Sequence, residues 1–165
     1  MVMFLSACGF SPLYVEHGQS AAVAGQLALI KVPPINDRVG QLVRIELTNR
    51  LTPTQAGATA TYLLPVTLTE SRTSLVVRKD AIATRANLTI NAAFKLLRIS
   101  DGAELTSGEI RSVNSYDIVD SSYATLAAES DARRRGATDV ADGIISRLAI
   151  FVSGSQHPHS AGQTR

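Results

Sequence analysis

The sequence predicts an α+β domain, a two-layer sandwich in which two helices pack on one face of a four-stranded mixed sheet in the order β-α-β-β-β-α. Two observations lead to this prediction. The middle of the chain alternates between apolar and polar residues, with the period of two that half-buried strands show. The segments on either side of it repeat apolar residues every three to four positions, which is the period of amphipathic helices.

The first two elements are a short apolar strand over residues 26–32 and a helix after it. The strand ends at two consecutive prolines, since proline has no N–H to donate to a strand ladder. Asn36 or Asp37 can cap the start of the helix, and Pro53 follows its end. The apolar stripe of this helix recurs every four residues, at Val39, Val43, Leu47 and Leu51.

Two strands with a period of two follow. The first covers residues 60–70, where Pro65 indicates an edge position or a bulge. Residues 71–82 are interpreted as a loop or as the frayed end of a hairpin. The next strand has the clearest alternation in the chain, and its apolar face consists of Ala86, Leu88, Ile90, Ala92, Phe94 and Leu96. Alternation of this length is typical of a half-buried antiparallel strand.

The last strand is predicted over residues 105–118, after a Ser-Asp-Gly turn signal, with Gly108 as a candidate bulge. From residue 122 to residue 152 the period becomes helical. The stripe of this helix is formed by Ala137, Val140, Ala141, Ile144, Leu148 and Phe151. Gly136 and Gly143 each weaken a helix by about 1 kcal/mol relative to Ala. We therefore expect them to permit close packing on the sheet.

The connections between elements set the expected strand directions and the extent of the domain. The last three strands are consecutive and antiparallel, whereas the helical crossover after the first strand suits parallel pairing. A length of 165 residues with 45% hydrophobic residues suits one domain with a buried core. We expect a signal-peptide remnant at residues 1–7, a lipidated tether at 8–25, the domain at 26–152 and a disordered tail at 153–165.

The N-terminal segment Leu5-Ser6-Ala7-Cys8 has the pattern of a bacterial lipobox, an aliphatic residue and two small residues before a cysteine. Cys8 is the only cysteine, so it has no intramolecular disulfide partner. In a lipobox the thiol becomes linked to diacylglycerol, and cleavage makes the cysteine the new N-terminus. Cys8 is therefore the predicted lipidation site, and a buried or chance cysteine is the alternative.

The stretch before Cys8 lacks two features of a working signal peptide. Only seven residues precede Cys8, and none of them is Lys or Arg, whereas a signal peptide has a basic region and a longer apolar core. We interpret residues 1–7 as the end of a signal peptide whose true start lies upstream. The predictions of export and of lipidation both depend on such an upstream start.

The residues after the lipobox carry a family resemblance. Cys8-Gly9-Phe10-Ser11-Pro12-Leu13-Tyr14 resembles the start of mature members of the LptE family, which are lipopolysaccharide (LPS)-assembly lipoproteins. The order of elements over residues 8–152 is also similar. The resemblance implies a periplasmic-side location at the outer membrane and an acyl anchor that includes palmitate. It also implies that the protein plugs an LptD-like β-barrel that inserts LPS.

A basic cluster at one end of the predicted sheet is the candidate site for LPS phosphates. Arg78 and Lys79 lie in the loop between two strands, and a hairpin would bring them close to Arg85 with only Asp80 to offset their charge. Arg and Lys side chains pair well with phosphate oxygens. The alternative is a solvated loop, and Lys95 on the following strand is the next candidate.

The sequence provides no evidence for a catalytic site, a cofactor or a metal site. His17, His157 and His159 fall in the predicted flexible ends, and no phosphate-loop, dinucleotide-binding or nucleophile-elbow motif is present. The run Arg133-Arg134-Arg135 is interpreted as a solvated helix face, with contact to anionic lipid as the alternative. A formal charge of +2 is too small to indicate a nucleic-acid partner.

Two functions from different classes stay open at this point. The first is the barrel plug that the resemblance implies, and the second is another envelope lipoprotein, such as an auxiliary subunit of a lipid-transport system. An enzyme is a weaker third interpretation. Co-purification separates the first two, because a large β-barrel partner supports the plug and an inner-membrane transporter supports the auxiliary subunit.

Acylation of Cys8 is the first testable prediction. Each buried CH₂ group contributes about 0.8 kcal/mol to membrane binding, so two or more acyl chains form a stable anchor. Mass spectrometry of the membrane fraction is expected to show acylated Cys8 at the N-terminus, without residues 1–7. In lipoproteins similar to this one, Gly9 rather than Asp after the cysteine implies outer-membrane sorting. An intact Met1 and a free thiol would contradict the prediction.

Overall fold

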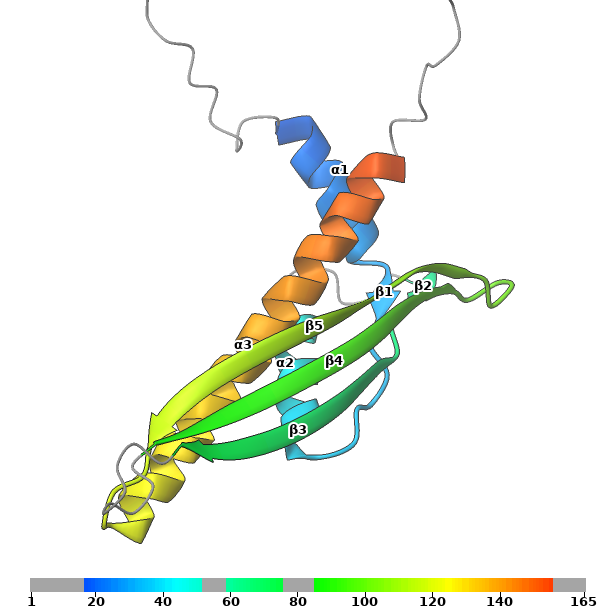
Figure 1. The fold of residues 1–165 in the computed structure, drawn as a ribbon. Coiled ribbons are helices and arrows are strands. Elements are labelled where there is room, and N and C mark those ends of the chain that lie inside the picture. The colour runs from blue at the N-terminus through cyan, green and yellow to red at the C-terminus, as the bar shows by residue number, and fades with distance from the viewer. Residues whose placement is uncertain (1–16, 52–58, 76–84, 156–165) are drawn as a thin grey trace, which may run out of the picture.

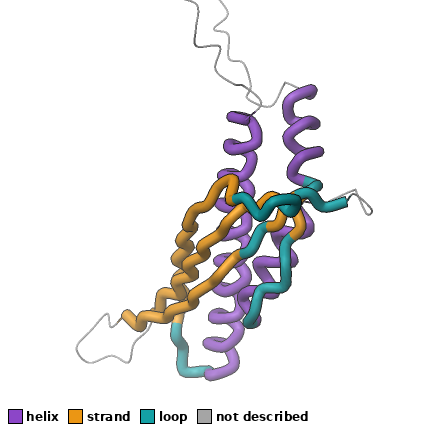
Figure 2. The backbone as a smooth tube through the Cα atoms, turned by 90° about the vertical axis from the view of Figure 1, so that its right-hand side faces the viewer, coloured by secondary structure: helices purple, strands orange, loops and turns teal. Residues whose placement is uncertain are grey.

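The computed structural model describes residues 17–51, 59–75 and 85–155, which form one sheet with all three helices on the same side (Figures 1 and 2). The helices are α1 (His17–Leu27), α2 (Arg38–Leu51) and α3 (Ser122–Ser155). The strands are β1 (Ile30–Lys31), β2 (Tyr62–Leu63), β3 (Val66–Leu75), β4 (Arg85–Arg98) and β5 (Glu104–Asp117). The predicted α+β sandwich with a mixed sheet is confirmed, with one more helix and one more short strand than expected.

The N-terminal part of the domain differs most from the prediction. Residues 17–27, expected to be mostly tether, form α1, and the strand expected over 26–32 is only Ile30–Lys31. Alanine is the best helix former, and α1 is rich in it. Figure 1 shows α1 beside the C-terminal end of α3, beyond the sheet. This contact between helices stabilises a helix that the sequence pattern alone did not indicate.

The strand predicted over residues 60–70 is divided at Pro65 into β2 and β3. Pro65 cannot donate to a ladder, but its carbonyl accepts the Lys95 N–H at 3.2 Å and keeps the segment beside β4. β3 then continues to Leu75, so residues 71–75 are the end of a hairpin strand, and the alternative of a loop is wrong for them. The remainder of that expected loop, from residue 76, lies outside the described residues.

β4 is the central strand of the sheet. β5 pairs antiparallel with one side of it, and β3 and then β2 pair antiparallel with the other side. β1 pairs parallel with β2, as the helical crossover predicted. The predicted turn before β5 is also present, with Gly102 at a φ of 70°, a conformation that glycine adopts without steric cost.

The bulge in β5 is not at Gly108. The register shifts between Leu96 and Leu97 and skips Leu105, while Gly108 keeps a regular partner in Phe94. A Cβ atom at Gly108 would lie 3.1 Å from the Phe94 ring. Glycine therefore gives the Phe94 ring room to pack closely on the β5 backbone, and a larger residue would require the ring to shift.

The core lies between the inner face of the sheet and the helices α2 and α3. All six residues of the predicted β4 face are at most 2% exposed, which confirms the predicted strand face: Ala86, Leu88, Ile90, Ala92, Phe94 and Leu96. The two glycines of α3 permit the close packing that we expected. A Cβ atom at Gly136 would lie 2.7 Å from Ile90 Cδ1, and one at Gly143 would lie 2.9 Å from Ile110 Cγ2.

A partly buried polar contact links α3 to β5. The Ser112 hydroxyl, on a residue that is 5% exposed, donates to Asp139 Oδ2 at 2.8 Å. Asn114 Nδ2 donates to the same carboxylate oxygen at 3.0 Å. Hydrogen bonds to a charged group are stronger than neutral ones, so these contacts help to set the rotation of the helix over the strand.

Truncation of Phe94 tests the core. Phe94→Ala should lower the free energy of unfolding by about 3–5 kcal/mol, because the ring is buried between β5 and the helices. Denaturant unfolding of Phe94→Ala and of Tyr123→Ala, whose parent side chain is 83% exposed, provides the comparison. The Tyr123 variant should stay within about 0.5 kcal/mol of the parent. A Phe94→Ala change as small as that would show that the strand face is wrong.

Candidate functional site

The structure describes one residue of the predicted phosphate cluster. Arg85 is the first residue of β4, and Cys8, Arg78 and Lys79 lie outside the described residues. Arg85 Nε donates to Asp117 Oδ1 at 3.0 Å, and both side chains are more than half exposed. Asp117 is 32 positions away in the sequence and reaches Arg85 through the β4–β5 register. The sequence analysis counted only Asp80 against the cluster and missed this carboxylate.

Lys95, the next candidate, is also paired. Its Nζ donates to Glu104 Oε2 at 2.8 Å. The hydrogen bonds from Lys95 and then Ser107 hold the pKa of Glu104 below its ordinary value. An exposed pair of this kind contributes little to stability, but it does reduce the attraction of Lys95 for an external anion.

The three consecutive arginines of α3 all have acidic partners. Arg133 Nε donates to Glu70 Oε1 at 3.0 Å, which joins α3 to β3, and Arg133 also pairs with Glu129. The hydrogen bond with Glu70 is the main cause of the raised pKa of Arg133. Arg134 and Arg135 both pair with Asp131. The triplet therefore resembles an ion-paired helix face more than a free cationic patch.

The outer face of the sheet is a broad surface that was not singled out from the sequence. All three helices lie on the other side, so the described part of the chain leaves this face uncovered (Figures 1 and 2). Its exposed residues are mostly small and polar, and include Thr67, Thr69, Ser71, Thr73, Asn91, Ala93, Ser107, Glu109, Arg111 and Ser115. The period-two pattern of the strands contained this signal, because these residues alternate with the buried ones.

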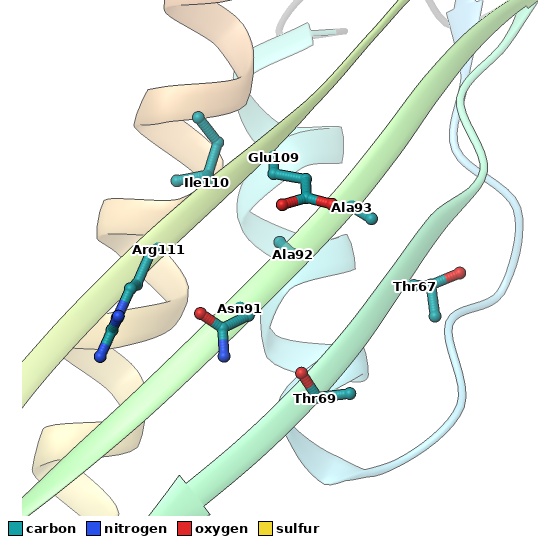
Figure 3. Close-up of a pocket in the computed structure, with 8 residues that line it drawn as sticks. All are labelled: Thr67, Thr69, Asn91, Ala92, Ala93, Glu109, Ile110 and Arg111. Atoms are coloured by element: carbon teal, nitrogen blue, oxygen red, sulfur yellow. The ribbon is translucent and has the colours of Figure 1, made fainter.

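A shallow hollow of about 500 Å³ lies over the middle of this face (Figure 3). β3 contributes Thr67 and Thr69, β4 contributes Asn91 and Ala93, and β5 contributes Glu109 and Arg111. A second hollow of about 360 Å³ shares Thr67, Ala93 and Glu109 with the first and extends toward Pro65 and Lys95. Together they form a continuous trough across three strands.

The chemistry of this trough suits binding. Hydroxyl and amide groups can donate and accept hydrogen bonds, and Arg111 and Glu109 add one charge of each sign. Among residues 17–51, 59–75 and 85–155 there is no group of three His, Cys, Asp or Glu side chains that could hold a metal ion. The lining of the trough also includes Ala92, Ala93 and Ile110, so it offers apolar contact beside its hydrogen-bonding groups.

None of the described helices is both long enough and apolar enough to cross a membrane.

The fold and the polar face define a small α+β binding and assembly module. The sequence model of the LptE family, described as lipopolysaccharide-assembly, matches residues 26–148, and the chain belongs to this family. It is thus an LPS-assembly protein of a non-enzymatic family. This membership confirms the resemblance seen in the sequence and favours LPS assembly over the other functions considered.

Solved structures agree with the family assignment. A lipoprotein from Caulobacter crescentus is 28% identical with a TM-score of 0.68, and the match covers 81% of this chain and 98% of that one. Rare lipoprotein B from Shewanella oneidensis is 17% identical with a TM-score of 0.59, covering 78% and 97% of the two chains. Lipoprotein B from Nitrosomonas europaea is 19% identical with a TM-score of 0.56, covering 81% and 88%. No curated protein matches the sequence significantly.

Proposed function

We propose that this chain is an outer-membrane lipoprotein, anchored through Cys8 on the periplasmic side, that plugs an LptD-like β-barrel and assists LPS insertion. The uncovered polar face of the sheet is the observation that carries this proposal. The lumen of outer-membrane barrels is polar, whereas their lipid-facing surface is apolar. A sheet face of Thr, Ser and Asn side chains can exchange hydrogen bonds with water for hydrogen bonds with such a lumen at little cost.

The one-sided arrangement of layers supports the same proposal. The core needs only one face of the sheet, since α2 and α3 bury the inner residues of β4. The outer face contributes little apolar burial to folding, so its residues can be complementary to the surface of a partner without destabilising the core. Its charges include Lys95, Glu109, Arg111 and the Arg85–Asp117 pair, and they would be matched across the contact or remain at its rim.

A charge placed in the trough tests the proposed barrel contact. Ala93→Arg puts a bulky cation at the centre of the uncovered face, and Ser146→Arg puts the same group on the exposed side of α3. Co-purification with the barrel should fall by about tenfold or more for Ala93→Arg, because a bulky side chain in the middle of the trough keeps the two surfaces apart, even with Glu109 opposite it on β5. Ser146→Arg should behave as the parent.

Both variants should keep the thermal midpoint of the parent, because neither residue lies in the core. If Ala93→Arg retains the barrel as well as the parent does, the uncovered face is not the contact. If the parent co-purifies with an inner-membrane transporter and no barrel, the auxiliary-subunit function replaces the plug.

Arg78, Lys79 and Arg85 remain our proposal for the LPS-phosphate site. Arg85 is the first residue of β4. This strand begins at the end of the sheet opposite to α1, the first helix of the chain (Figure 1). The 34 residues of α3 span this length, about 50 Å at roughly 1.5 Å per residue. Asp117 reduces the net charge that Arg85 offers to an anion.

The phosphate site is tested by changing Arg78, Lys79 and Arg85 together to Ser, because a single exposed ion pair contributes only about 0–1 kcal/mol. Binding of LPS should weaken and its dependence on salt should flatten, since charge pairing near a surface is screened. The matched control changes Lys31, Arg38 and Arg134 to Ser, which removes the same charge from exposed positions elsewhere. If the triple variant and the parent have the same affinity and salt dependence, these residues are not the site.

A further inference from the structure

The outer edge of β3 is open for pairing. β3 has ten residues, Val66–Leu75, and pairs with β4 on one side only. Within the described part of the chain no strand pairs with its other side. An unpaired edge offers a row of backbone N–H and C=O groups to another strand, and proline or lysine commonly blocks it. β3 contains neither residue.

The sequence of β3 is complementary to itself in the antiparallel direction. A two-fold axis at Ser71 places Glu70 opposite Arg72 of a second copy, and Thr69 opposite Thr73 of that copy. Opposite charges and Thr–Thr pairs are both favourable across neighbouring strands. A two-fold contact forms each of these pairs twice, because both copies present the same surface.

The charged residues of this edge also select the partner. Glu70 and Arg72 point to the helix side, where they pair with Arg133 and Glu129 of α3. Inward-pointing charges commonly prevent an edge from pairing with unrelated strands, because their charge must be matched. In β3 the negative residue Glu70 precedes the positive residue Arg72. A matching strand must present a positive and then a negative residue, and an antiparallel copy of β3 does so.

Both charged side chains have capacity for a further partner. Arg72 donates a long hydrogen bond of 3.4 Å to Glu129, and 56% of its side chain remains exposed. The Glu70 side chain remains 28% exposed beside Arg133. A hollow of about 530 Å³, lined by Arg38, Val39 and Leu68 among others, also keeps the space between α2 and the edge open.

We propose that two copies of this chain associate through antiparallel pairing of their β3 edges, centred on Ser71, to form one continuous sheet. This association goes beyond the proposed function, because it requires neither the barrel nor LPS. It would protect the edge of β3 in protein that has not reached a partner.

Disulfide trapping tests the pairing and its register. The parent is the full chain with Cys8→Ser, so that an introduced cysteine is the only thiol. Residues opposite each other on antiparallel strands have Cα atoms about 4.5–5.5 Å apart, within the range for a disulfide. Ser71→Cys should therefore form a covalent dimer under mild oxidation. The covalent dimer should form at least about tenfold faster than one formed by random collision, since strand pairing raises the effective concentration of the thiols.

Two controls define the register and the edge. Thr73→Cys keeps the thiol on β3, but the two-fold axis separates the two introduced thiols by four strand positions, about 13 Å, so this variant should not form a dimer alone. A mixture of Thr69→Cys and Thr73→Cys chains should form one between them. Ser107→Cys, exposed on β5, measures random collision.

An independent measurement uses no cysteine. Sedimentation of the Cys8→Ser chain should show a dimer. Arg72→Glu should give a monomer with a folded far-ultraviolet spectrum, because Glu70 of each copy would then face a second carboxylate instead of a guanidinium. Equal cross-linking of Ser71→Cys and Ser107→Cys, or a monomer at every concentration, would overturn the proposal. Cross-linking of Ser71→Cys in cells to the barrel rather than to a second copy would also overturn it and assign the edge to the barrel.

Discussion

The close approach of α3 to β4 and β5 is the contact on which the rest of the structure depends. Glycine at positions 136 and 143 lets the helix backbone rest on Ile90 and Ile110, where any Cβ atom would come within 3 Å. Asp139, between the two glycines, accepts hydrogen bonds from Ser112 and Asn114 and so aligns the helix with β5. With α2 beside it, α3 completes a core on one side of the sheet, and one layer of helices is sufficient for a domain of this size.

One-sided packing also determines where function can lie. The inner residues of β4 are fully committed to the core, whereas the outer residues of β3, β4 and β5 have little role in burial. That outer face is polar, shallow and nearly balanced in charge, which suits a broad contact with another polar surface better than enclosure of a small molecule. Membership of a lipopolysaccharide-assembly family agrees with a protein that acts through contact surfaces.

The ion pairs change how the basic residues of this chain are interpreted. The sequence suggests two cationic groups, one around Arg85 and one at the arginine triplet of α3. In the structure, Asp117 faces Arg85, and Glu70, Glu129 and Asp131 face the triplet. Exposed pairs of this kind add little stability, but they reduce the net field available to an anion. The pair between Glu70 and Arg133 also links the edge strand β3 to α3.

The sequence by itself determined the family, the predicted lipidation site and the buried faces of the strongly periodic elements. The alternation along β4 and the glycines of α3 are local patterns, and each predicts a local property: which side chains face the core and where a helix can come close. Only the tertiary structure decided the helix at residues 17–27, the extension of β3 to Leu75 and the pairing of Arg85 with Asp117. These features depend on strand register and helix docking, which join residues far apart in the chain. Periodicity cannot report them because it records which face is buried and not what lies against it.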